Sequence, residues 1–272
     1  VSIFDRGFLY GDSVYEVVRT YHGIPFLLNE HLDRLWQSAN KLDFVVSWER
    51  ERVIKEINKV LGELGVDNIY LRIMITRGEG PLTLDPSFSG NNNLVIIGKE
   101  LSENPIWWYQ KGVRVLITQV QRTAKNSIDP NIKSGNYLTH IMALKEAKKD
   151  GAFDAIMLNA DGMVTEGTTS NVWCIKNQVI YTPPITAGIL EGITRKTLLQ
   201  LAKKHHLVVE QKNFNAEDLL NADEAFLSAS VKEIIPITEV DHGPIGTGVP
   251  GPLTQKLCQL YKDFIEEQTL LK

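Results

Sequence analysis

Lys133 stands in a short polar stretch, NIKSGNYLTH, that comes just before an apolar pattern with helical spacing. Turn-forming residues lie on both sides of it, so the lysine is predicted at a loop-to-helix junction rather than along an exposed helix face. Tyr137 follows four residues later, one helical turn away, and its hydroxyl could reach whatever the lysine holds. A lysine amine can form a Schiff base with a carbonyl compound. Most lysines are simply solvated, so this pair alone does not identify a site.

Glu166 lies inside an apolar strand pattern, VTEGTTSNVW, residues 164–173. A buried carboxylate is costly unless it meets a cation or hydrogen-bond donors. An edge strand that leaves Glu166 in solvent would explain the same pattern. Both interpretations stay open on these residues alone.

The stretch GILEGITRKTLL, residues 188–199, places Gly192, Ile193 and Thr194 at the mouth of a predicted helix. The free N–H groups and the dipole of a helix N-terminus favour phosphate. Any capped helix looks similar, so the motif is weak by itself.

Two further features could assist at such a site. Ser228 and Ser230, in LSASVKEIIPI, stand at a strand-to-turn junction and form a plausible second cradle. Arg34, on the first predicted helix, could supply a cation, although a surface ion pair is the ordinary explanation. Together, a lysine amine, a carboxylate, a helix mouth and a tyrosine are the parts needed to hold pyridoxal phosphate.

Composition limits the other possibilities. The chain has 272 residues, 43% hydrophobic and 23% charged, as in an ordinary soluble globular protein long enough for two cores. A net charge of −4 does not favour electrostatic binding to nucleic acid or anionic lipid. Cys174 and Cys258 resemble neither a disulfide framework nor a zinc site, so no metal is expected. No apolar run reaches the roughly 20 residues of a membrane span, and a cytoplasmic location is expected.

The elements that must position these residues alternate between strands and helices, which predicts an α/β or α+β fold of two domains. SVYEVVRTY should form a hairpin with IPFLL through a turn at His22-Gly23, and Asn29 should cap the following helix. A second helix is expected over 51–64. Further strands are predicted at IYLRIMIT, NLVIIG, VRVLITQV, DAIMLN, VTEGTTSNVWCI, LVVE, EAFLSAS and IIPIT, and further helices from about Tyr137, Thr194 and Pro252.

The pattern breaks around ENPIWWYQKG. We therefore predict a small N-terminal domain over residues 1–102, a linker over 103–110 and a larger C-terminal domain over 111–272. Because Val1 is not a methionine and the opening residues look extended, we expect further residues upstream of Val1.

The whole chain, from FDRGFLYGDSVYEVVRTY to SASVKEIIPI, resembles the class-IV aminotransferases, also called fold-type IV pyridoxal-phosphate enzymes. The most specific part runs from Glu166 to Arg195, where E-x-T-x-x-N, I-x-T and L-x-G-I-x-R stand at the family's spacing. Trp173 departs from the usual Phe or Tyr, which suggests a packing change. The resemblance implies a pyridoxal-phosphate-dependent transaminase that works by a ping-pong mechanism, and a homodimer. It also implies that the residues expected upstream of Val1 form the first strand of the small domain.

Residue by residue, the resemblance implies that Lys133 is the catalytic Schiff-base lysine. It implies that Tyr137 contacts the cofactor oxygen and that Glu166 holds the pyridine nitrogen. The cofactor phosphate would be bound by the residues that match the family's phosphate motif: Arg34, Ile193, Thr194 and Ser230.

The resemblance also implies a set of residues that face the substrate: Tyr10, Tyr15, Val17, Arg19, Tyr70, Arg72, Val231 and Lys232. Within this set, Tyr10, Arg19 and the Tyr70–Arg72 triplet resemble branched-chain aminotransferases. Tyr15 and Val17 resemble the D-amino acid and (R)-amine branches. The loop RGEGPLTLDPS lacks both the Arg-x-His pair of D-amino acid aminotransferases and the glycine/arginine-rich loop of the lyases.

Arg19, Arg72 and Lys232 supply up to three cations, which suits a dicarboxylate such as 2-oxoglutarate. We favour a hydrophobic, branched-chain-type amino acid as the other substrate. The alternatives are a D-amino acid transaminase with a non-standard carboxylate site, an aminodeoxychorismate lyase, and a non-catalytic binding protein of the same fold. That last alternative should have eroded Lys133, Tyr137 or Glu166, yet all three are present.

Overall fold

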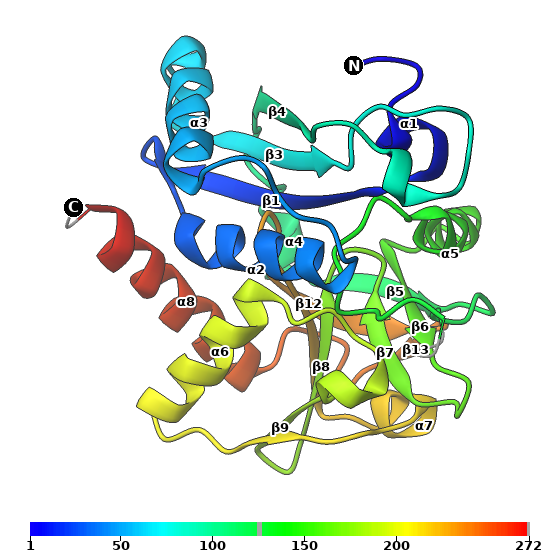
Figure 1. Ribbon diagram of the computed structural model, residues 1–272. Helices are drawn as coiled ribbons and strands as arrows, with labels where there is room; N and C mark the ends of the chain where they lie inside the picture. Colours follow the sequence, from blue (N-terminus) through cyan, green and yellow to red (C-terminus); the bar gives the residue numbers. More distant parts are fainter. Residues whose placement is uncertain (124–126, 271–272) are drawn as a thin grey trace. The chain divides into compact units, whose positions relative to one another are not determined.

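The computed structural model describes residues 1–123 and 127–270, and these separate into two compact units (Figure 1). Among the described residues, the first comprises 1–102, 132–137 and 268–270, and the second comprises 103–123, 127–131 and 138–267. The short segment Ile132–Tyr137, which contains Lys133, therefore belongs to the first unit by its contacts. None of the helices described is long and apolar enough to cross a membrane.

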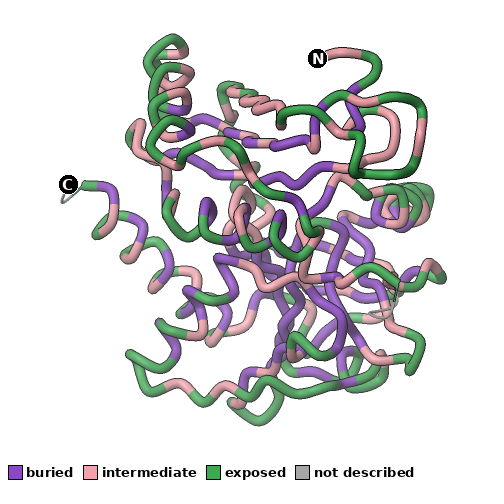
Figure 2. The backbone as a smooth tube through the Cα atoms, in the orientation of Figure 1, coloured by how far each residue is buried: buried purple, intermediate pink, exposed green. Residues whose placement is uncertain are grey.

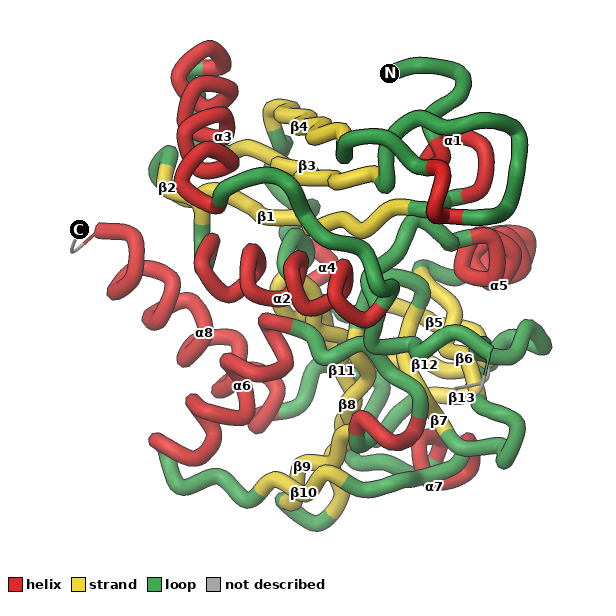
Figure 3. The backbone as a smooth tube through the Cα atoms, viewed as in Figure 1, coloured by secondary structure: helices red, strands yellow, loops and turns green. Residues whose placement is uncertain are grey.

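The first unit is built on an antiparallel sheet with strand order β2-β1-β3-β4 (Figure 3). Its strands are β1 (Ser13–Tyr21), β2 (Ile24–Pro25), β3 (Ile69–Thr76) and β4 (Asn93–Glu100). On one face of β1, Val14 and Val18 are fully buried in the core of this unit. Helices α2 (Leu28–Lys41) and α3 (Arg50–Leu64) cover that face with Leu32, Leu35, Val53 and Ile57. The opposite face of β1 is therefore free to present other side chains.

Two local predictions for this unit are wrong. Helix α2 begins at Leu28 rather than after an Asn29 cap, because Leu27 adopts a left-handed conformation, with φ of 52°, and turns the chain directly into the helix. The opening residues, expected to be extended, instead contain the short helix α1 (Arg6–Tyr10). The Asp5 carboxylate accepts from the Gly7 N–H to start α1, and Gly11, with φ of 70°, ends it.

The second unit contains a closed ring of strands, because β7 pairs with β8 as well as with β6. The ring runs β8-β11-β12-β5-β6-β7, and β9, β10 and β13 extend it. Its strands are β5 (Val113–Ile117), β6 (Asp154–Leu158), β7 (Val164–Gly167), β8 (Asn171–Lys176), β11 (Glu224–Ala229) and β12 (Glu233–Val240). The outer strands are β9 (Val179–Thr182), β10 (Val209–Gln211) and β13 (Gly243–Pro244). Most ring residues are buried (Figure 2).

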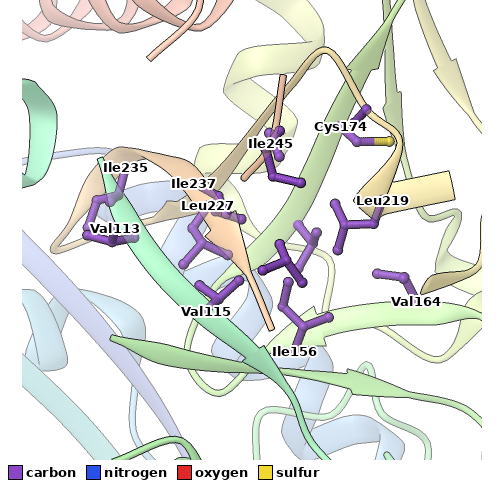
Figure 4. Close-up of a cluster of buried hydrophobic side chains, with 14 of the residues drawn as sticks. Val113, Val115, Ile156, Val164, Cys174, Leu219, Leu227, Ile235, Ile237 and Ile245 are labelled. Carbon is purple, nitrogen blue, oxygen red and sulfur yellow. The ribbon is translucent and has the colours of Figure 1, made fainter. Parts of the chain in front are cut away.

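The ring strands share one hydrophobic core, in which Val115, Ile156, Leu227 and Ile237 point toward one another (Figure 4). Longer helices of the unit are α5 (Leu138–Lys149), α6 (Ile193–Lys204) and α8 (Pro252–Leu270), and shorter ones are α4 (Trp107–Gln110) and α7 (Ala216–Leu220). Burial of this many branched side chains supplies the main driving force for folding the unit.

The predicted single strand VTEGTTSNVWCI is in fact two strands, β7 and β8, joined by a tight turn in which Glu166 pairs with Asn171. The physical reason is the buried Asp154 carboxylate on neighbouring β6. Its oxygens accept from the Thr168 hydroxyl, from the Thr168 N–H at 3.3 Å and from the Ser170 hydroxyl at 3.3 Å. These hydrogen bonds give the polar groups of Thr168 and Ser170 in the turn a partner, and the turn places Glu166 opposite Asn171.

Candidate active site

The Lys133 side chain lies within hydrogen-bond distance of Tyr137, as their spacing suggested. The Lys133 Nζ donates to the Tyr137 hydroxyl at 3.1 Å, and both side chains are half-buried. The Lys133 backbone is held at both ends: its N–H donates to the Ser38 hydroxyl of α2 at 3.2 Å, and its carbonyl accepts from the Tyr15 N–H of β1 at 3.0 Å. A strand and a helix of the first unit thus fix the position of the lysine.

Tyr15 forms an aromatic wall beside this lysine. The centre of its ring lies 4.6 Å from the Lys133 Nζ and 3.7 Å from the Arg72 guanidinium carbon, and the Tyr137 ring meets it edge-on at 5.4 Å. Burial, together with the neighbouring Tyr137, raises the pKa of the Tyr15 phenol well above its usual value. The phenol therefore stays neutral and offers its π face to two cations.

The register of the first sheet places most predicted substrate residues on one face. Val17 pairs with Arg72 and Arg19 pairs with Tyr70 across β1 and β3. Directly opposite partners in antiparallel strands point to the same side. The row of side chains continues onto β4, where Ile97 pairs with Arg72. Ile97 therefore belongs to the same face, although it was not predicted from the sequence.

Arg34, predicted to bind phosphate, makes a buried ion pair with Glu16. Its Nε and one terminal nitrogen donate to the two Glu16 oxygens at 2.6 and 2.8 Å, and the His31 Nδ1 lies 2.7 Å from the same carboxylate. Burial acts to raise the pKa of Glu16, but the Arg34 charge and the hydrogen bonds outweigh it and lower that pKa to about 2. Burial lowers the pKa of His31, so the ring is neutral and donates from Nδ1. A carboxylate is therefore ionised in the core of this unit.

The role of Glu16 was not predicted from the sequence, although a signal was present. Glu16 stands in the buried half of the β1 alternation, between Val14 and Val18, where a carboxylate requires a cation. Arg34 on α2 is that cation. The proposed contact of Arg34 with a phosphate stays a prediction.

Glu166, on β7, is buried and not in solvent. One carboxylate oxygen accepts from the Arg122 Nε at 2.7 Å and the other accepts from the Leu190 N–H at 2.9 Å. Burial acts to raise the pKa of Glu166, but His140 and Arg122 outweigh it and lower the pKa. The carboxylate is therefore ionised at neutral pH. Arg122 lies in a loop after β5, and no sequence pattern pointed to it.

Leu190, whose N–H contacts Glu166, lies just before the N-terminus of α6 and helps to position it. Asn171 donates to the Leu190 carbonyl at 2.9 Å, so both backbone polar groups of Leu190 are anchored. Gly192 is the N-cap and carries no side-chain cap. A Cβ at Gly192 would lie 2.0 Å from the Asn171 amide oxygen, so any other residue would displace the Asn171 side chain from Leu190. The N–H groups of the first turn, including those of Ile193 and Thr194, are therefore not capped by an N-cap side chain.

The turn after β11 carries Ser230, Val231 and Lys232. Asn104 donates to the Val231 carbonyl at 3.1 Å, and the Tyr109 hydroxyl donates to the Lys232 carbonyl at 3.2 Å. The Lys232 Nζ donates to the Thr169 hydroxyl at 3.2 Å.

Of the two serines in the predicted cradle, Ser228 accepts from the Trp173 indole at 2.9 Å. Trp173 also stacks on Phe226, with ring centres 5.3 Å apart. The unusual tryptophan therefore has a packing partner and a hydrogen-bond partner of its own.

Residues 13–240 match the family model described as amino-transferase class IV. The chain is a class IV aminotransferase. It is 36% identical to a putative branched-chain-amino-acid aminotransferase of Methanocaldococcus jannaschii, over 97% of this chain and 91% of that protein. It is also 36% identical to the D-alanine aminotransferase of Bacillus licheniformis, over 99% of this chain and 93% of that protein.

Solved structures agree with this assignment. The T.th. branched-chain amino acid aminotransferase, solved with N-(5′-phosphopyridoxyl)-L-glutamate, superimposes with a TM-score of 0.92 at 28% identity. The match covers 97% of this aminotransferase and 88% of that chain. The two-domain fold-type IV architecture predicted from the sequence is confirmed, and so are the aminotransferase activity and the cofactor, pyridoxal phosphate.

The residues of this aminotransferase suit that cofactor. Lys133 provides an amine paired with a phenol, and Glu166 provides a buried, ionised carboxylate. The glycine-capped mouth of α6 offers backbone donors of the kind that bind phosphate.

Proposed function

We propose that this enzyme transfers the amino group of hydrophobic, branched-chain-type amino acids to 2-oxoglutarate, with Lys133 as the catalytic lysine. The observation that carries the assignment of Lys133 is its 3.1 Å contact with the Tyr137 hydroxyl, on a backbone fastened to both β1 and α2. Such a lysine is preorganised, so little motion is needed to bring its amine to a reacting carbon.

Pyridoxal phosphate, when bound, supplies an aldehyde for the amino group and a ring that accepts the electron pair left at Cα. The Lys133 Nζ removes the proton from Cα, and the Tyr137 hydroxyl orients that nitrogen. Glu166 holds a proton at the pyridine nitrogen, and its lowered pKa keeps it ionised for that role. Arg34, Ile193, Thr194 and Ser230 bind the phosphate.

The substrate preference is supported by the charges on the predicted substrate residues. Arg19 and Arg72 stand on the same sheet face as Tyr15 and Val17, so apolar and cationic side chains alternate there. A monocarboxylate uses one cation and 2-oxoglutarate uses two, and Lys232 could supply another. Tyr10 contacts the side chain of the amino acid. The T.th. enzyme, whose structure holds an L-glutamate adduct, supports glutamate as the partner.

A D-amino acid transaminase is the second candidate. The 36% identity to the Bacillus licheniformis D-alanine aminotransferase and the presence of Tyr15 and Val17 favour it.

A stereochemically resolved half-reaction distinguishes the two candidates. The enzyme loaded with pyridoxal phosphate is mixed with single L- or D-amino acids, and the visible absorbance of the bound cofactor is followed. L-leucine, L-isoleucine and L-glutamate are expected to bleach it, and their D-enantiomers should not. Bleaching by D-amino acids alone would replace the first candidate with the second, and bleaching by no amino acid would remove both.

We also propose that the enzyme is a homodimer. Helix α5 leaves Leu138, Ile141 and Met142 75%, 57% and 59% exposed, and this spacing puts them on one helix face. Light scattering should give about twice the chain mass of 30.6 kDa, and Ile141→Glu should lower that mass. A wild type that stays at the single-chain mass at micromolar concentration would contradict the proposal.

A further inference from the structure

Arg6 is the least expected charged group in the first unit, because only 3% of its surface is exposed. Its guanidinium donates to three successive carbonyls of the loop between β3 and β4: Thr83 at 2.8 Å, Leu84 at 3.0 Å and Asp85 at 3.4 Å. Its Nε donates to the Asp12 carboxylate at 3.1 Å. One planar side chain thus fixes the backbone of a whole turn, because its N–H groups diverge in a rigid fork.

The base of the same loop is fastened independently. Asp12 also accepts from the Arg77 Nε at 2.8 Å, and Arg77 donates to the Leu42 carbonyl at 2.8 Å. Gly78, with φ of 99°, lies so close to the Asn91 carbonyl that a Cβ would come within 2.1 Å of it. The loop is therefore anchored at its base by Arg77 and at its tip by Arg6.

The tip that Arg6 holds is apolar and exposed. Leu82 and Leu84 are 72% and 77% exposed, beside the carbonyls that Arg6 binds. A surface loop is ordinarily mobile, and ordering its backbone costs conformational entropy. Here the hydrogen bonds of the buried Arg6 offset that cost and hold Leu82 and Leu84 in a defined, solvent-exposed position. The same guanidinium also lies 5.2 Å from the centre of the Tyr10 ring.

We propose that Arg6 is a positioning residue for substrate specificity, which fixes Tyr10 and the Thr83–Asp85 turn as one apolar surface for the amino-acid side chain. This inference rests on the proposed function, in which Tyr10 contacts the substrate, and on the guanidinium of Arg6, which joins the Thr83–Asp85 turn to Tyr10. It adds that their geometry is set by a residue that itself does not touch the substrate. Arg6 should therefore affect bulky amino acids and leave small ones nearly unchanged.

The test compares Arg6→Ala and Arg6→Lys with Arg50→Ala. Arg50 is a matched control in the same unit, because it also binds a carboxylate, that of Asp33, and a backbone carbonyl, that of Asn29. Steady-state kinetics are measured with leucine and with alanine, each as the enantiomer that the half-reaction identifies. Chymotrypsin cleavage after Leu82 and Leu84 reports the order of the loop, and cofactor absorbance reports the surroundings of Lys133.

For Arg6→Ala we expect cleavage of the loop to be about 10-fold faster and KM for leucine about 10-fold higher. Values for alanine should stay within about 3-fold of wild type, with an unchanged cofactor spectrum. Arg6→Lys should show the same pattern more weakly, because an ammonium cannot bind three carbonyls in one plane. Arg50→Ala should match wild type.

An unchanged cleavage rate in Arg6→Ala, or equal losses for leucine and alanine, would overturn the proposal. If Arg6→Ala does not fold, Leu84→Ala takes its place: the exposed tip is shortened while Arg6 remains, and the loss should again be confined to leucine. Equal activity of Leu84→Ala and wild type on leucine would also overturn the proposal. A wild type that reacts with no amino acid removes the proposed function itself, and the cleavage assay then still reports whether Arg6 orders the loop.

Discussion

Replacing Lys133 by alanine is expected to lower the transamination rate by at least about 10⁴-fold, because the chain then lacks both the nucleophilic amine and the base at Cα. The change should alter the free energy of unfolding by less than about 1 kcal/mol, since the Lys133 side chain is only half-buried. Its backbone hydrogen bonds to Ser38 and Tyr15 do not depend on the side chain. Steady-state kinetics and thermal unfolding measure the two quantities.

Lys59→Ala is the matched control, because Lys59 is an exposed lysine on α3, in the same unit as Lys133. It should retain wild-type activity and the wild-type cofactor spectrum. Lys133→Ala should also lose the absorbance that depends on a covalent link between lysine and cofactor, and borohydride should no longer attach the cofactor to the chain. Retained activity in Lys133→Ala would show that another residue performs the chemistry.

Glu166→Gln is expected to lower the rate by about 10²–10³-fold. A neutral amide cannot hold a proton at a pyridine nitrogen as a carboxylate does, and the difference corresponds to about 3–4 kcal/mol of transition-state stabilisation. The glutamine oxygen can accept from the Arg122 Nε or from the Leu190 N–H, but its NH₂ group then faces the other donor. We therefore also expect a loss of about 1–3 kcal/mol in the free energy of unfolding.

Glu224→Gln separates the two effects. Glu224 is a second buried glutamate of the same unit, and its carboxylate accepts from the Leu253 and Thr254 N–H groups at the start of α8. Its loss should lower stability to a similar extent while leaving the rate per folded molecule near the wild-type value. If Glu166→Gln, like Glu224→Gln, kept the wild-type rate per folded molecule and lost only stability, Glu166 would have a purely structural role.

The strands and longer helices were largely predictable because their patterns are local. The strand expected at IYLRIMIT is β3, and the helix expected over residues 51–64 is α3, which ends at Gly65. Predictions failed where the backbone is decided by a group outside the local pattern. The Asp154 carboxylate, on a different strand, splits the predicted strand into β7 and β8. The left-handed Leu27 moves the start of α2 ahead of Asn29.

The sequence by itself determined the chemistry of this protein. The amine, the carboxylate, the tyrosine and the glycine-capped helix mouth stand at spacings that identify the family, because local sequence sets which elements carry them. Only the tertiary structure decided which partners the buried charged groups have. Arg34 binds Glu16, Arg122 binds Glu166, and Arg6 binds the carbonyls of the Thr83–Asp85 turn. Each of these contacts joins residues far apart in the chain. A buried charge requires a compensating partner, and the tertiary fold determines which group lies close enough to serve. The local sequence pattern does not specify that partner.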